Sequence, residues 1–149
     1  AARTRLPVCL MHMQGTPKTM QGNPQYQHVV HSVIDFLKQR IIAAQAAGIP
    51  RDKLVLDPGF GFGKTLQQNL QLLNSLSEIK ALGFPLLAGI SRKSMLGLIL
   101  DKPVNDRLYA GLSAAVIAAQ NGADIIRVHD VIETREALSV VQALRQMDH

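Results

Sequence analysis

Residues 54–65 read LVLDPGFGFGKT, an apolar run that ends in an aspartate and is followed by glycine at every second position up to a lysine. The run is continuous rather than alternating, which is typical of a strand buried on both faces of a parallel sheet. Leucines then recur at positions 66, 70, 73 and 76, and this spacing predicts an amphipathic helix. The stretch therefore predicts one βα unit, in which a glycine-rich loop joins a buried strand to a helix.

The same unit recurs along the chain. Three further continuous apolar runs, Val8–Met13, Pro85–Ile90 and Ile125–His129, each precede a helical pattern. Right-handed crossovers place such strands side by side in one parallel sheet. Both an open doubly wound sheet and a (β/α)8 barrel fit this order, but a barrel needs eight units and ~250 residues. The predicted fold class is therefore α/β with four parallel βα units, which would be half of a barrel.

Glycine, proline and capping residues predict where the helices begin and end. Asn23-Pro24 predicts the start of the first helix, and Gly48 its end. The stretch SMLGLIL at residues 94–100 suggests an additional short helix. The second helix is expected to end near Gly83, the third to run from near Asp106 to Gly122, and the fourth to begin near Glu133.

The composition favours small-molecule partners over macromolecular ones. Hydrophobic residues make up 47% of the chain and the formal net charge is +5, yet no basic run is longer than Arg92-Lys93. The polybasic arms that bind nucleic acid or membrane surfaces are therefore missing. No stretch approaches the ~20 apolar residues of a membrane-spanning helix. We therefore expect small-molecule substrates, with no nucleic acid and no membrane as partners.

The single cysteine and the first residues bear on compartment and completeness. Cys9 excludes an internal disulfide and favours a reducing compartment, so a cytoplasmic protein is expected. Cys9 lies in an apolar run, which favours a buried and inert thiol. The chain opens AARTRLPVCL, without an initiator methionine or a signal-peptide pattern, and runs almost at once into a strand. We therefore expect a piece of a longer protein.

The glycine-rich loop fits neither of two common nucleotide-binding patterns. A phosphate loop, G-x-x-x-x-G-K-[ST], would need glycine at the position of Pro58, which has no N–H to offer a phosphate. A dinucleotide loop, G-x-G-x-x-G, would need glycine at the position of Lys64. Glycines that simply allow positive φ after a strand remain as the plain interpretation.

Polar and small residues follow every predicted strand at its carboxyl end. They are found in CLMHMQG at residues 9–15, in LLAGISRKS at 86–94 and in IIRVHD at 125–130, as well as in residues 57–63. Ligands of parallel α/β folds bind at the carboxyl ends of the strands. The four segments together therefore predict one ligand site.

The charges in these segments favour an anionic ligand. Arg127 and His129 are two apart on a strand and share a face, and burying both without an anion would be costly. The alternative is a structural ion pair with a carboxylate such as Asp57 or Asp130. Residues 91–94, Ser-Arg-Lys-Ser, gather donors before a helix N-terminus, which also suits an anion, although a solvated charge pair is the alternative there.

Two other polar residues have plain structural interpretations. Asp57, the acid that closes its strand, could cap a turn over Gly59. His12 lies between two methionines and is expected to be packed in the core. None of the five histidines shows a ligand spacing such as H-E-x-x-H, so we predict no protein-held metal.

Four motifs, MHMQGTPKTMQ, LDPGFGFGK, GISRKS and IIRVHD, resemble those of the dihydropteroate synthase family in order and spacing. The resemblance spans essentially all 149 residues but covers only the C-terminal half of that family, the last four βα units of a (β/α)8 TIM barrel. It implies that residues 1–149 form a partial pterin-binding domain whose N-terminal half is absent. The family condenses 6-hydroxymethyl-7,8-dihydropterin diphosphate with 4-aminobenzoate to 7,8-dihydropteroate and pyrophosphate in folate biosynthesis.

The resemblance implies a role for each matching residue. Asp57 would accept from the amino-pyrimidine edge of the pterin, because a carboxylate matches two parallel N–H donors. Lys93 would bond the oxo group and a ring nitrogen, and Arg127 would stack on the ring. The pterin site implied in full is Met11, Asp57, Phe62, Gly89, Lys93 and Arg127.

The remaining sites follow from the same resemblance. Arg127 and His129 would hold the diphosphate. Mg²⁺ would be held by the substrate diphosphate and the absent N-terminal half, and the intact protein would be a homodimer and a sulfonamide target. The 4-aminobenzoate site implied is Gly61, Phe62, Ser91 and Lys93. The catalytic set implied, acting through position and charge, is Asp57, Lys93, Arg127 and His129.

Two other functions stay open from the residues. A pterin-dependent methyltransferase has a similar pterin-binding barrel, but the S-R-K-S and R-V-H elements suit a diphosphate that such an enzyme never uses. A non-catalytic fragment that holds pterin weakly, or holds nothing, is the other. This half alone is expected to be inactive as a synthase, because the missing half supplies part of the diphosphate and aminobenzoate contacts.

Overall fold

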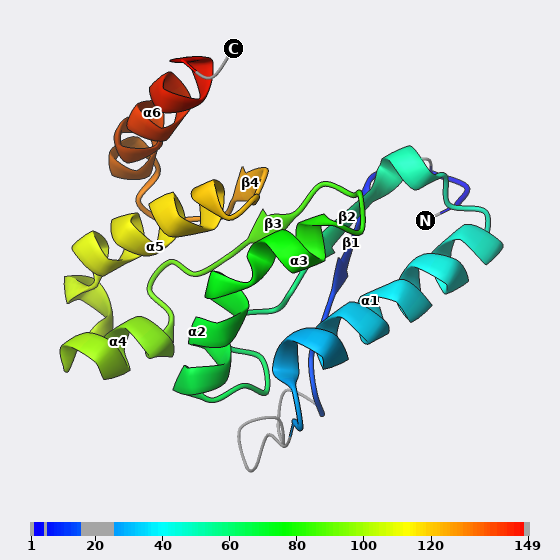
Figure 1. The fold of residues 1–149 in the computed structure, drawn as a ribbon, viewed down its shortest axis with the longest axis horizontal. Coiled ribbons are helices and arrows are strands. Elements are labelled where there is room, and N and C mark those ends of the chain that lie inside the picture. Colours follow the sequence, from blue (N-terminus) through cyan, green and yellow to red (C-terminus); the bar gives the residue numbers. More distant parts are fainter. Residues whose placement is uncertain (1, 5, 16–25, 148–149) are drawn as a thin grey trace.

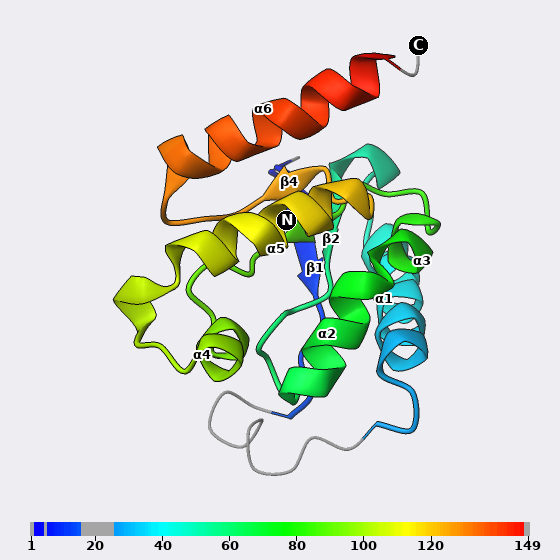
Figure 2. The ribbon, with the colours of Figure 1, turned by 60° about the vertical axis from the view of Figure 1, so that its left-hand side comes forward.

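The computed structural model describes residues 2–4, 6–15 and 26–147. All the strand pairings in this part of the chain are parallel, which confirms an α/β fold with parallel strands. The strands are β1 (Val8–Met11), β2 (Leu54–Asp57), β3 (Leu87–Ala88) and β4 (Ile125–Ile126). Figures 1 and 2 show helices following each strand along the chain.

The strands lie side by side in chain order. β1 pairs with β2, from Val8 beside Leu54 to Met11 beside Asp57, and β3 pairs with β4. A parallel bridge between Leu56 and Leu86 joins the two pairs. β1 and β4 therefore lie at opposite ends of the row, and the carboxyl ends of the strands meet at one edge.

The helices of the described residues form a layer against this row. Figure 1 shows α2 between α1 and α5, with α6 beyond α5, and these neighbours are in contact. Two 3-10 turns, Arg51–Lys53 and Val104–Asp106, precede β2 and α5. The α-helices are α1 (Val29–Ala46), α2 (Leu66–Asn74), α3 (Leu76–Lys80), α4 (Ser94–Leu100), α5 (Leu108–Gln120) and α6 (Val131–Met147). The short helix predicted at residues 94–100 is confirmed by α4.

Several boundaries differ from those predicted. The first helix begins after the extended residue His28, later than the start predicted from Asn23-Pro24, which lies outside the described residues. The second predicted helix is divided into α2 and α3, because the backbone of Ser75 leaves helical geometry. The last helix begins two residues before Glu133. β3 and β4 are shorter than their apolar runs, although the Arg127 N–H still donates to the Ala88 carbonyl at 3.0 Å.

The core lies between the strands and the helices. Leu54, Leu56 and Leu86 of the strand row are fully buried against Leu37 of α1 and Leu72 of α2. The strand ends are thus held by a buried apolar layer, which can keep their side chains in place.

No helix in the described part of the chain combines the length and apolarity that crossing a membrane requires.

The two outermost strands of the row, β1 and β4, expose a thiol and an apolar side chain. Cys9 on β1 is exposed, so the expectation of a buried thiol is wrong, because alternate side chains of an end strand point away from the core. At the other end, Ile125 of β4 is 41% exposed. The exposed apolar residues of α6, at 54–82%, are Val131, Ile132, Val140, Leu144 and Met147.

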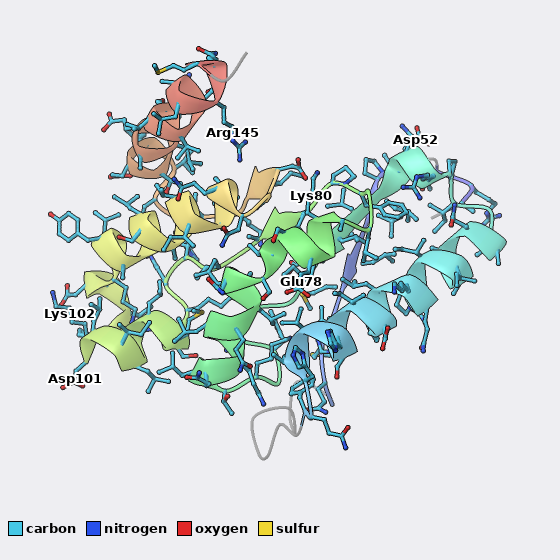
Figure 3. The ribbon with its side chains drawn as sticks, in the orientation of Figure 1. Asp52, Glu78, Lys80, Asp101, Lys102 and Arg145 are labelled. Carbon is cyan, nitrogen blue, oxygen red and sulfur yellow. The ribbon has the colours of Figure 1, made fainter. Side chains whose placement is uncertain are left out.

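Three hydrogen bonds tie the later elements together. Lys80 of α3 donates to the carboxylate of Asp124, just before β4, at 2.6 Å, and that carboxylate also accepts from the Leu86 N–H at 2.8 Å. Arg145 reaches from α6 toward α5, where it donates to the Ala119 carbonyl (Figure 3). The first two join α3 and the segment before β4 to the strand row, and the third joins α6 to α5.

Candidate functional site

Asp57 ends β2 as a buried carboxylate that is only 2% exposed. Its Oδ1 accepts from the Gly59 N–H at 2.8 Å, so the turn-capping interpretation is correct for this oxygen. Its Oδ2 faces Nη2 of Arg127 at 3.5 Å. Burial raises the pKa of Asp57, while the Gly59 N–H and the charges of Arg127, Lys93 and Lys64 act against that rise. One carboxylate thus serves the turn with one oxygen and faces a cation with the other.

The glycines of the following loop allow close approach. Gly59, Gly61 and Gly63 have φ of 71°, 79° and 63°, the left-handed region that glycine favours. A Cβ on Gly59 would lie 1.9 Å from the His12 carbonyl oxygen, and one on Gly63 would lie 2.6 Å from that of Gln14. The segment after β1 therefore packs directly on the loop, as only glycine permits.

Lys93 lies on the outer side of the same loop. Its Nζ donates to the Phe60 carbonyl and lies 4.2 Å from the centroid of the Phe62 ring, within the range of a cation–π contact. A Cβ on Gly61 would lie 3.0 Å from Cδ of Lys93. Burial lowers the pKa of Lys93, with the Asp57 carboxylate acting against this and the Arg127 charge adding to it.

The remaining predicted residues gather beside Lys93 in a cavity of about 150 Å3. Ser91 Oγ lies 3.0 Å from His129 Nδ1 and also accepts from the His129 N–H at 3.3 Å. Arg127 leaves 58% of its side chain exposed. The lining of the cavity is Gly89, Ser91, Lys93, Arg127, Val128 and His129.

The structure places Gly89 beside Arg127 and Met11 beside Asp57. A Cβ on Gly89 would lie 2.9 Å from Nη2 of Arg127, so any larger residue would displace the guanidinium. Met11 is the partner of Asp57 in the pairing of β1 with β2 and is half-buried. Asp57, Lys93, Arg127 and His129 are thus brought to one edge, in agreement with the predicted convergence.

Arg92 does not join this cluster. Its guanidinium pairs with Asp130 at 2.6 Å, which raises the pKa of Arg92 and lowers the pKa of Asp130 through that hydrogen bond. Asp130 is therefore the partner of Arg92 rather than of Arg127 or His129. Arg107 of the segment before α5 donates to the Arg92 and Lys93 carbonyls at 3.0 and 3.3 Å. Arg107 thus binds the loop that carries Lys93, and this contact was not predicted from the sequence.

Two buried polar residues that bind the glycine loop were also not predicted. Lys64 is 4% exposed, and its Nζ donates to the Gly59 and Phe62 carbonyls at 2.8 and 3.0 Å. Burial lowers the pKa of Lys64 to about 7, with Asp57 acting against this and Lys93 adding to it. Asn69, 2% exposed in α2, accepts from the Gly61 N–H at 2.8 Å. In the sequence, Asn69 could have been recognised as an amide on the apolar face of the predicted helix.

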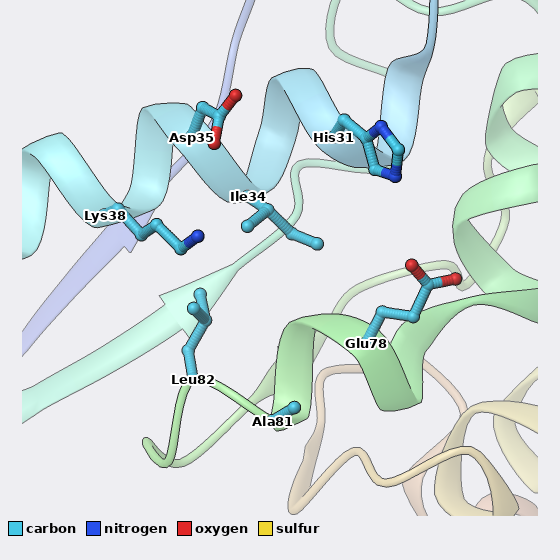
Figure 4. Close-up of a pocket in the computed structure, with 7 residues that line it drawn as sticks. All are labelled: His31, Ile34, Asp35, Lys38, Glu78, Ala81 and Leu82. Carbon is cyan, nitrogen blue, oxygen red and sulfur yellow. The ribbon is translucent and has the colours of Figure 1, made fainter.

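A larger groove lies away from the strand ends. Its volume is about 700 Å3, and it runs between α1 and α3, where Figure 4 shows His31 and Glu78 pointing into the space between the two helices. None of the residues predicted for the site lines it. Convergent charge at the strand ends, rather than size, therefore marks the candidate site.

Comparison with known proteins assigns the chain to a class. The family model described as pterin binding enzyme matches residues 1–129. The match covers most of the chain, so the chain belongs to the pterin binding enzyme family.

Relatives and solved structures have a more specific name. The chain is 52% identical over 143 residues to the dihydropteroate synthase of Haemophilus influenzae, and 54% identical to that of Escherichia coli. The Yersinia pestis dihydropteroate synthase, solved with a sulfonamide drug complex, matches 98% of this chain with 53% identity and a TM-score of 0.96. The Xanthomonas albilineans enzyme in complex with 7,8-dihydropteroate matches 97% with 44% identity and a TM-score of 0.89.

The chain spans about half the length of the curated relatives it matches. The alignment takes in 96% of this chain but 52% of the Haemophilus protein and 51% of the Escherichia protein. The chain likewise covers 53% and 52% of the two solved chains. Half of each relative therefore has no counterpart in these 149 residues.

Proposed function

We propose that a protein containing this chain is a dihydropteroate synthase, which joins 6-hydroxymethyl-7,8-dihydropterin diphosphate to 4-aminobenzoate in folate biosynthesis. The observation that carries the proposal is the strand-end cluster, in which a buried carboxylate faces Arg127 beside the cavity that Lys93 and His129 line. Relatives at 52% and 54% identity have this name.

The fold of the whole protein is proposed to be a (β/α)8 TIM barrel. The chain would supply its last four βα units as a partial pterin-binding domain, with the N-terminal half outside these residues. The strand row supports this, since β1 and β4 lie at its ends and expose Cys9 and Ile125. In a closed barrel both ends would be paired.

The pterin would bind against β2 and β3. Oδ2 of Asp57 would accept from the amino-pyrimidine edge, since a carboxylate offers acceptor sites beyond the one used by Gly59. Lys93 has three N–H donors, so it can bond the pterin oxo group and a ring nitrogen. Gly89 would let the flat ring approach the backbone, with Met11 as a wall.

The diphosphate would bind to Arg127 and His129. The largely exposed guanidinium of Arg127 could stack on the pterin and also donate to phosphate oxygens. No group of three His, Cys, Asp or Glu side chains within residues 2–4, 6–15 and 26–147 could hold a metal ion. These residues therefore do not fit Mg²⁺ as its ligands, and in the proposed enzyme the diphosphate and the other half would hold it.

The 4-aminobenzoate would lie over the glycine loop, against Gly61 and Phe62, with Ser91 and Lys93 near its carboxylate. Its amine is neutral at pH 7 and can attack the pterin methylene carbon without a general base. The new C–N bond forms, the C–O bond to the diphosphate breaks, and the released pyrophosphate takes the electron pair. The amine proton passes to solvent or to pyrophosphate. The residues would act by positioning and by neutralising charge.

Three further properties are part of the proposal. The intact protein would be a cytoplasmic homodimer, and the apolar groove of about 410 Å3 between α2, α4 and α5 offers a surface for a second copy. Ile99, Tyr109 and Ile117 line this groove and are 51%, 79% and 43% exposed. Sulfonamides would compete with 4-aminobenzoate, as the drug complex of the Yersinia relative suggests.

Turnover of both substrates by the intact protein tests the proposal. We expect 7,8-dihydropteroate and pyrophosphate in equal amounts, measured by mass spectrometry, and inhibition by a sulfonamide that added 4-aminobenzoate relieves. Replacing Arg127 by Met should abolish most of the turnover. Binding of a pterin analogue without any product from the two substrates would instead favour a non-catalytic pterin-binding protein.

A further inference from the structure

We infer that Lys64 is a positioning residue for the aminobenzoate pocket, because with Asn69 it holds the glycine loop that carries Phe62. The inference rests on the proposed function, where Gly61 and Phe62 face 4-aminobenzoate. The strand-end cavity is lined by other residues, so Lys64 would act through the loop and not on the ligand.

Lys64 binds the loop from its inner side. Its ammonium group donates to the carbonyls of Gly59 and Phe62, the two ends of the tight turn that places Phe62. The Phe62 N–H closes the same turn by donating to the Gly59 carbonyl at 3.1 Å. Donation to both carbonyls fixes their orientation, and with it the plane of the peptide that follows Phe62.

Asn69 and Tyr26 hold the rest of the loop. The Asn69 Oδ1 accepts from the Gly61 N–H at 2.8 Å, while its Nδ2 donates to the Thr65 carbonyl at 2.8 Å and to the Lys64 carbonyl at 3.2 Å. The Tyr26 hydroxyl donates to the Gly63 carbonyl at 2.9 Å. A loop with three glycines in left-handed geometry has little conformational preference of its own. Its shape is therefore set by these side chains.

The outer side of the same loop is part of the proposed active site. Lys93 crosses Gly61, donates to the Phe60 carbonyl and lies 4.2 Å from the Phe62 ring centroid. A shift of the loop would therefore move the ring and the ammonium group together. Both groups belong to the aminobenzoate pocket and also to the proposed pterin site. The pterin site keeps four residues outside the loop, Met11, Asp57, Gly89 and Arg127, so 4-aminobenzoate should respond more than the pterin.

The chemistry of Lys64 supports a positioning role over simple packing. Burying an ammonium group is costly unless it is paired, and an apolar side chain of similar length would fill the same space at lower cost. Lys64 adds directed hydrogen bonds and a third positive charge near Asp57, beside those of Arg127 and Lys93. The loop thus contains a costly group whose two hydrogen bonds both hold the loop.

Kinetics of the intact enzyme test this role. In Lys64→Met, the KM for 4-aminobenzoate should rise about tenfold or more at saturating pterin diphosphate, because the two hydrogen bonds from the buried Lys64 amine to the loop are lost. The kcat should stay within about threefold, a split that general loss of folded protein would not produce. Asn69→Leu should shift KM in the same direction, and Lys64→Arg, which keeps donors and charge, should recover part of the loss. Lys38→Met, at an exposed lysine of α1, is the matched control.

A readout that needs no activity separates this inference from the proposed function. With ¹⁹F-labelled phenylalanine, the Phe62 resonance should shift in Lys64→Met, while that of Phe84, which packs under Arg51, should not. A wild-type KM, or an unshifted Phe62 resonance, overturns the inference even if the melting temperature falls. If the wild type makes no dihydropteroate, the proposed function fails, and the resonance alone decides the role of Lys64.

Discussion

Single residues at the end of β2 create an uneven distribution of charge. One buried carboxylate, Asp57, faces Arg127 at 3.5 Å and also feels the charges of Lys93 and Lys64. Burial raises the pKa of Asp57, and these cations act against the rise, so the carboxylate depends on its neighbours to stay ionised. The excess of positive charge suits an anionic substrate, while the single acceptor group suits a ligand edge made of N–H donors.

The substitution Asp57→Asn tests the acceptor role. The amide keeps the shape but presents a donor where two acceptors are required. In the intact protein we expect the affinity for a pterin analogue to fall by about 2 kcal/mol, the cost of a mismatched charged hydrogen bond. Isothermal titration calorimetry would measure the change, with Asp52→Asn at an exposed turn as the control. An unchanged affinity would count against the assigned role.

His12 makes the stability of the fold depend on pH. It is 5% exposed and packs edge-on against Phe36 at 5.0 Å between ring centroids, as the expectation of a packed histidine requires. Burial, with help from the Lys64 charge, lowers its pKa to about 4 from 6.5. Between these values the unfolded chain binds a proton that the folded chain does not, so the stability due to neutral His12 is present above pH 6.5 and is lost as pH falls toward 4.

The expected loss is up to about 3 kcal/mol of unfolding free energy over that window. Urea denaturation of the intact protein from pH 7.5 down to pH 4 would measure it in the wild type and in His12→Phe. The difference between the two proteins should shrink or reverse as the pH falls. Parallel pH dependence in both would show that His12 is not the group responsible.

Helix α2 links the loop to the rest of the fold. Its N-terminus has a capping box, in which Thr65 Oγ1 accepts from the Gln68 N–H at 3.3 Å and Gln68 Oε1 accepts from the Thr65 N–H at 2.8 Å. Asn69 lies one residue after this box, so the cap also fixes the amide that holds Gly61. The capping box of α2 thus helps to position the loop of the proposed site.

Thr65→Ala should destabilise the intact protein by about 1 kcal/mol, since the N-cap acceptor is lost. Chemical denaturation would measure the effect, with Ser77→Ala, an exposed position within α3, as the control. The variant should also raise the KM for 4-aminobenzoate, though by less than Lys64→Met. Equal stability of variant and wild type would mean that the cap contributes nothing to α2.

At the scale of the whole molecule, the unpaired outer edges of β1 and β4 and the exposed apolar residues of α6 influence whether the chain associates. Backbone groups of β1 and β4 on the sides away from their partners can pair with another chain. α6, which follows β4 along the chain, exposes five apolar residues at 54–82%. Exposed apolar surface of this kind drives association.

We therefore expect residues 1–149 alone to self-associate, as two half-barrels would, or to be only marginally stable. They should not turn over the two substrates, because half of the proposed diphosphate and aminobenzoate contacts are missing. Sedimentation velocity and a coupled pyrophosphate assay would test both statements, with the intact protein as the control. A compact, cooperatively folding monomer would contradict the first, and dihydropteroate formation by that monomer the second.

Local sequence patterns determined the order of strands and helices, the short helix at 94–100 and the polar residues at each strand end. Buried strands, helix faces and glycine loops are all recognised within a few residues, so periodicity can predict them. Contacts between distant segments were decided only by the tertiary structure. Arg92 pairs with Asp130 across 38 residues and Arg127 faces Asp57 across 70, and nothing in the local pattern selects those partners. Likewise, only the packing of the glycine loop buries the Lys64 amine and directs it to the Gly59 and Phe62 carbonyls.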